Sequence, residues 1–152
     1  MVNDVILMLH PAAGVLAILA AVWVAAEMIN VNNGNVSRIR GTSLAVAGLA
    51  WLAYLLAGYW YVRYYAADKA WILAGPWPFA HNIVMETKEH VFFPLLMLAS
   101  YLPIAASNNL IASKGARILV LCSAVLIVLL GLAMEGGGAM ISMAAKLGIL
   151  AK

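Results

Sequence analysis

Four long apolar runs joined by short polar linkers constrain this chain more than any other feature of its sequence. The runs comprise residues 11–29, 42–62, 91–106 and 116–134. A helix that crosses the hydrocarbon core of a membrane needs about 20 such residues. With 66% hydrophobic and 10% charged residues, the chain has too little charge to cover a water-soluble monomer. We therefore expect an all-α integral membrane protein, built as a four-transmembrane-helix bundle.

The polar segments leave room for one membrane domain over residues 1–152. Its expected helices are about 5–29, 42–65, 80–106 and 116–134. Three glycines follow Glu135, and because glycine weakens a helix we expect an interfacial tail over 135–152. The first and third helices each open a helical pair, so the bundle is expected to consist of two pseudo-repeated hairpins.

Basic residues indicate an orientation. The linkers 30–41 and 107–115 are rich in Asn, Ser and Gly, and with their flanks they carry four basic residues and no acid. Short loops rich in Lys and Arg tend to remain cytoplasmic. We therefore expect a bacterial or archaeal cytoplasmic membrane, with both termini on the non-cytoplasmic side. Before the first run stand Asp4 and no Lys or Arg, so that run is expected to persist as a helix rather than serve as a signal peptide.

Composition also excludes several function classes. The nine Lys and Arg residues are scattered and form no basic stripe, so no nucleic-acid partner is expected. The single cysteine, Cys122, excludes an internal disulfide framework, a CxxC redox pair and a CxxCH haem attachment. The expected surroundings are the lipid bilayer and either further copies of the chain or a larger membrane complex.

Ionisable residues at membrane depth cost free energy to bury, and they are therefore candidates for a functional role. His10 and His90 each precede a long apolar run, which places both near the same boundary of the hydrocarbon. Pro11 suits the first turn of a helix, whereas Pro94 cannot donate a hydrogen bond to the carbonyl of His90. We therefore expect His10 and His90 to face one another across the bundle.

Helical spacing places the ionisable residues of the third helix on two opposite faces. Glu86 precedes His90 by four residues and shares its face. Lys88 and His81 lie on roughly the opposite face, so His81 and His90 cannot ligate one metal in a regular helix. The possible secondary site residues are His81, Glu135 and Glu27.

Aromatic residues concentrate in the middle connection, where residues 59–79 hold eight of the fourteen. Tyr and Trp prefer the headgroup level of a membrane, so an aromatic belt is the simpler interpretation and a quinone pocket is the alternative. The segment Gly75-Pro76-Trp77-Pro78 forbids continuous helix and predicts an ordered turn.

His10-Pro11 at the start of the first helix and His90 within METKEHVFF resemble small four-helix membrane b-type cytochromes, of the cytochrome b561-like and copper-resistance D-like kind. The resemblance implies one haem b with His10 and His90 as axial ligands. Further expected contacts of the cofactor are Glu86, Lys88 and Arg63. The b561 pattern uses four histidines for two haems, whereas this chain has three.

These features predict a membrane electron-transfer protein that passes electrons between a quinol or membrane partner and a redox protein. The first alternative is a non-redox membrane subunit or transporter in which the His and Glu residues handle protons or a cation. A second alternative is a structural anchor of a larger complex. A non-haem metal site would use His10, Glu86, His90 and Glu135, but no HExxH or paired ExxH motif supports it.

Overall fold

The computed structural model describes the backbone of residues 2–151 and the side chains of residues 5–151. In this part of the chain the secondary structure is helical, with short turns and no strand. The helices are α1 (Val2–Ile29), α2 (Val36–Ala74), a short π-helix η1 (Ala80–Met85), α3 (Glu86–Ala106) and α4 (Lys114–Leu150). Four helical segments are long and apolar enough to cross a membrane, η1 and α3 counting as one. The predicted all-α four-helix membrane bundle is confirmed.

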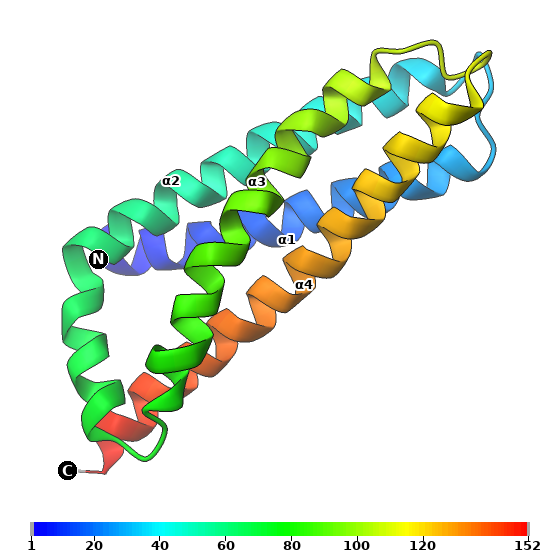
Figure 1. Cartoon of the computed structure of the whole chain (residues 1–152). Coiled ribbons are helices and arrows are strands. Elements are labelled where there is room, and N and C mark those ends of the chain that lie inside the picture. The colour runs from blue at the N-terminus through cyan, green and yellow to red at the C-terminus, as the bar shows by residue number, and fades with distance from the viewer. Residues whose placement is uncertain (1, 152) are drawn as a thin grey trace.

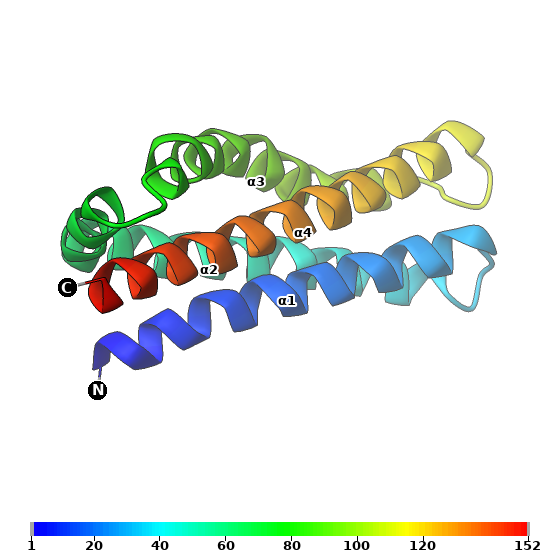
Figure 2. The ribbon, with the colours of Figure 1, turned by 90° about the horizontal axis from the view of Figure 1, so that it is seen from below.

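The four helices form a bundle in which α1 and α3 are diagonally opposite one another. Helix α1 packs against α2 and α4, and α3 packs against the same two helices (Figures 1 and 2). Within the described residues, no Cα atom of α1 lies within 8 Å of one in α3. A group on α1 and a group on α3 can therefore meet only across the centre of the bundle.

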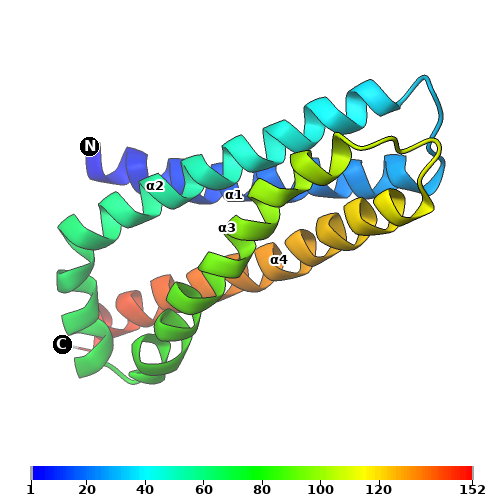
Figure 3. The ribbon, with the colours of Figure 1, turned by 45° about the horizontal axis from the view of Figure 1, so that its top comes forward.

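The loops between α1 and α2 and between α3 and α4 lie at one end of the bundle, which we call the loop end. Both termini and the turn between α2 and η1 lie at the other end (Figures 1 and 3). Arg40, near the start of α2, connects this helix to the end of α3. Its guanidinium donates to the carbonyls of Ala106 at 3.0 Å, Ser107 at 3.1 Å and Asn108 at 3.2 Å. These carbonyls end α3 and have no partner within the helix, so Arg40 serves as their cap.

Helix α4 is longer than the sequence predicts. We expected it to end at Met134 and to be followed by an interfacial tail over 135–152, but the helix continues to Leu150. The reason is packing, because Gly137 lies against Val84 and Lys88, and Gly148 lies against the main chain of Trp71. Glycines that allow such close approach stabilise this helix more than their flexibility weakens it.

Helix α2 also exceeds its predicted range of 42–65 at both ends. At its start, the buried Asn35 donates to the carbonyls of Glu27 and Asn30, which tightens the turn so that the helix begins at Val36. At its end, α2 stops at Ala74, immediately before the predicted turn at 75–78.

The last part of α2 turns away from the bundle axis toward the end of α4 (Figures 1 and 3). There it forms a second apolar core with η1 and α4, separate from the main core of the bundle. Its buried members are Tyr65, Ile72, Ala80, Ile141, Ala144 and Ala145. We call this cluster the outer core, since it lies at the end that holds the termini.

Candidate functional site

Three ionisable side chains from three helices lie at one level of the bundle. Measured along their helices from the loop end, His10, Lys88 and Glu135 lie at about 29, 27 and 32 Å. The hydrocarbon core of a bilayer is about 30 Å thick. With the polar loops at one boundary of the hydrocarbon, these three residues lie at the other. We call them the polar layer.

Glycines make room for the polar layer. The carboxylate of Glu135 lies against α1 at Gly14, so closely that a Cβ at Gly14 would overlap its Oε1 atom. Across the bundle, a Cβ at Gly138 would lie 3.1 Å from Nζ of Lys88, and one at Gly137 would lie 3.3 Å from its Cδ. The stem of Lys88 thus rests on the glycine segment of α4, and its ammonium reaches the same helix that carries Glu135.

Lys88 and Glu135 interact electrostatically without forming a contact ion pair. Each lies within range of the other's charge, and Lys88 also acts on His10. Within the described residues the contact ion pair is instead Glu27–Arg38, at 3.0 Å near the loop end. All three members of the polar layer are partly buried.

The ring of His10 is held by α2. Its Nδ1 atom lies 2.9 Å from the carbonyl oxygen of Ala53. Because a carbonyl only accepts hydrogen bonds, Nδ1 carries the hydrogen and Nε2 keeps its lone pair in the neutral ring. His10 therefore offers Nε2 as a proton acceptor or as a metal ligand.

His90 and Glu86 lie on the outer face of α3. Both side chains are exposed, as are Phe93 and Met97 farther along the same stripe. The Nδ1 atom of His90 donates to the carbonyl of Glu86 at 2.6 Å, which again leaves Nε2 free. Glu86 and His90 share one face of α3, as their spacing predicts, but the face that points inward is the one that carries Lys88.

A sequence signal for the inward face exists. Counted from Lys88, the residues at positions 92, 95, 99, 102 and 106 are apolar or small and are buried or half-buried. A stripe with this spacing is typical of the core-facing side of a helix. The stripe through His90 is apolar as well, because it faces lipid, and this made the two faces hard to distinguish.

The remaining predicted site residues are dispersed. Arg63 is exposed on α2. Glu27 belongs to the loop end, where it pairs with Arg38. His81 is buried in η1, where its Nδ1 lies 3.0 Å from the hydroxyl of Tyr65. None of these three belongs to the polar layer.

The geometry of one chain does not bring His10 and His90 to a common ligand. They belong to the two diagonally opposite helices, and the ring of His10 is half-buried against α2 while that of His90 is exposed. A group of three or more His, Cys, Asp or Glu side chains that could hold a metal ion is absent from the described residues. In this arrangement the two histidines therefore do not face one another across the bundle, contrary to what the sequence had led us to expect.

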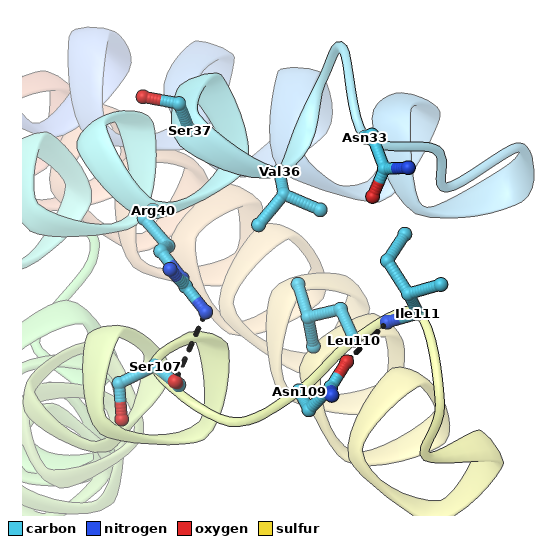
Figure 4. A pocket seen from close by; sticks show the side chains of 8 residues that line it. All are labelled: Asn33, Val36, Ser37, Arg40, Ser107, Asn109, Leu110 and Ile111. Carbon is cyan, nitrogen blue, oxygen red and sulfur yellow. Dashed lines mark hydrogen bonds between the residues drawn. The ribbon is translucent and has the colours of Figure 1, made fainter.

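A pocket of about 570 Å³ lies at the loop end, away from the polar layer (Figure 4). Arg40, Ser107 and Asn109 contribute its polar lining. The guanidinium of Arg40 is already hydrogen-bonded to main-chain carbonyls. We therefore interpret this pocket as the space that remains between the two loops beside these hydrogen bonds.

The chain matches no protein-family model, no curated protein and no solved structure. The resemblance to b-type cytochromes is thus carried by His10 and His90 alone and stays a prediction.

Proposed function

We propose that this membrane protein handles protons through the polar layer of His10, Lys88 and Glu135. The observation that carries the proposal is the convergence of an ammonium, a carboxylate and an imidazole from three helices at one level. Ionisable groups inside a membrane bundle are costly and mark proton or ion pathways.

The chemistry follows from the separation of the two charges. A proton that arrives on Glu135 removes the counter-charge of Lys88, and an ammonium without a counter-charge in a poorly solvated place favours the loss of a proton. The pair can therefore take up one proton and release another. Nε2 of His10, the nitrogen that Ala53 leaves free, is the acceptor on the α1 side.

The test is proton movement across vesicles that contain the purified protein and an internal pH-sensitive dye. We expect an imposed pH difference to decay faster than in protein-free vesicles, and Glu135→Gln and Lys88→Met each to abolish the difference. Matched controls are Glu27→Gln at the loop end and Lys146→Met, which is exposed on α4. Flux equal to wild type in Glu135→Gln and Lys88→Met would overturn the proposal.

Haem b is the second candidate, with electron transfer to a quinol or redox protein as its function. Its support is that His10 and His90 both donate Nδ1–H to a carbonyl, which leaves Nε2 free as metal-ligating histidines do. Since His90 faces outward, one iron reaches both rings only if α3 turns or a second copy supplies a ligand. An absorption spectrum of the purified protein decides: a Soret band lost in His10→Ala and His90→Ala supports haem, and a colourless preparation excludes it.

The orientation of the protein is part of the same proposal. The loop end carries Arg38, Arg40, Lys114 and Arg117 against one acid, Glu27. This excess of basic residues favours a cytoplasmic loop end. By helix length, the polar layer is about 30 Å from it. Protons would then enter the layer from the non-cytoplasmic side, where the termini lie.

A further inference from the structure

A buried tyrosine–histidine pair lies outside the polar layer, in the outer core. Tyr65 of α2 is 2% exposed and His81 of η1 is 5% exposed. The Tyr65 hydroxyl and Nδ1 of His81 are 3.0 Å apart, a hydrogen-bonding distance. Neither residue contributes to the layer described above, although both can carry a proton.

The π-helix places this pair beyond the polar layer. His81 lies on the segment that leads directly into α3, seven residues before Lys88 and toward the end that holds the termini. Val84, midway between them, packs against Gly137 of α4 together with the stem of Lys88. Single π-helical turns are rare and recur at functional sites. The pair therefore stands between the outer end of the molecule and the polar layer.

Two further groups connect the pair to the surface. The ring of Tyr61 stacks on that of Tyr65, with centroids 4.9 Å apart and planes at 20°. Tyr61 is 37% exposed, and the carboxylate of the exposed Glu89 lies beside its hydroxyl. From Glu89 through Tyr61 and Tyr65 to His81, proton-carrying groups follow one another from the surface into the interior.

We propose that Glu89, Tyr61, Tyr65 and His81 form the path by which protons reach the polar layer from the side of the termini. This inference rests on the proposed proton-handling function. Glu89 takes a proton from water and gives it to the oxygen of Tyr61, whose own hydroxyl proton passes through a bridging water to the oxygen of Tyr65. The hydroxyl proton of Tyr65 moves to Nδ1 of His81, and His81 releases the proton on Nε2 toward the layer. Each hydroxyl gains one proton as it loses one, so no tyrosinate remains.

The test uses the vesicle assay with Tyr65→Phe, which deletes one hydroxyl and keeps the ring that packs on Tyr61. We expect loss of most of the proton flux in Tyr65→Phe, Tyr61→Phe and His81→Gln. Tyr64→Phe is the matched control, since Tyr64 lies on the same helix and its ring contacts Tyr59 away from the path. Its flux is expected to equal that of wild type.

The outcomes separate the path from the function it serves. Wild-type protein without flux overturns both. Flux that Glu135→Gln abolishes, but that Tyr65→Phe and His81→Gln leave at the wild-type level, overturns the path alone. Thermal unfolding of each variant identifies loss of fold, and if Tyr65→Phe is misfolded, unchanged flux in Tyr61→Phe and His81→Gln overturns the path.

Discussion

The carboxylate of Glu135 lies directly over Gly14, so that α4 delivers an acid to a point on α1 that has no side chain. The neighbour of Gly14 is the far end of a flexible side chain, which can move away. A methyl group at this position therefore changes where Glu135 points more than it changes how the helices pack.

For Gly14→Ala we expect nearly unchanged stability and reduced proton flux. Replacing glycine by alanine inside a helix stabilises it by about 1 kcal/mol, which offsets the cost of moving Glu135. Thermal unfolding in detergent and the vesicle assay measure the two effects. Gly48→Ala is the control, because nothing lies within 4 Å of the added methyl group. Wild-type flux in Gly14→Ala would show that the contact with α1 is unimportant for Glu135.

Gly148→Ala, unlike Gly14→Ala, is expected to lower the stability of the protein. Its added methyl group meets the carbonyl of Trp71, a main-chain atom that cannot turn aside. We expect a loss of about 1 to 3 kcal/mol of stability, as for overpacked cores. Faster hydrogen exchange in the outer core would locate the damage there. Gly136→Ala, which has open space around it, should not show this loss.

Arg40→Ala removes the cap from α3 and separates the two loops. Three main-chain carbonyls lose a charged donor, and because the guanidinium is partly exposed we expect a loss near the lower end of such bonds, about 1.5 kcal/mol. Arg40→Lys should recover only part of it, since an ammonium lacks the planar fork of donors. An Arg40→Ala protein that unfolds at the wild-type temperature would contradict this role.

The topology predicts opposite accessibility of the two ends. In a chain that carries Cys122→Ser, a cysteine at Asn33 should react with an impermeant reagent from one side of the membrane only. A cysteine at Asp68 should react only from the other side. Labelling of both from the same side would contradict a bundle that spans the membrane four times.

The fold was predictable from the sequence because apolar runs of spanning length leave a chain few alternatives. The two lengths that were wrong, those of α2 and α4, have a common physical cause. Asn35 tightens the first turn and Gly148 permits a close crossing with Trp71, and both effects depend on contacts between distant parts of the chain. By helix propensity alone, the glycines of α4 predict the end of the helix, whereas in the structure they allow close packing against neighbouring segments.

The site was harder to predict than the fold. The sequence singled out His10, Lys88 and Glu135, but it did not show that these three share one level and one interior. In a membrane the outward face of a helix is as apolar as the inward face, so the apolar pattern of α3 could not decide between Lys88 and His90. The glycines at 137 and 138 held the missing information, because they leave room on α4 for the side chain of Lys88.

Helix α4 belongs to both cores, since it contributes Ile127 and Met134 to the bundle and Ile141 and Ala144 to the outer core. A straight helix transmits displacement along its length like a rod. A protein that bound the outer core would therefore contact the same helix that carries Glu135. The outer core is therefore a second place, away from the polar layer, at which the position of α4 is set.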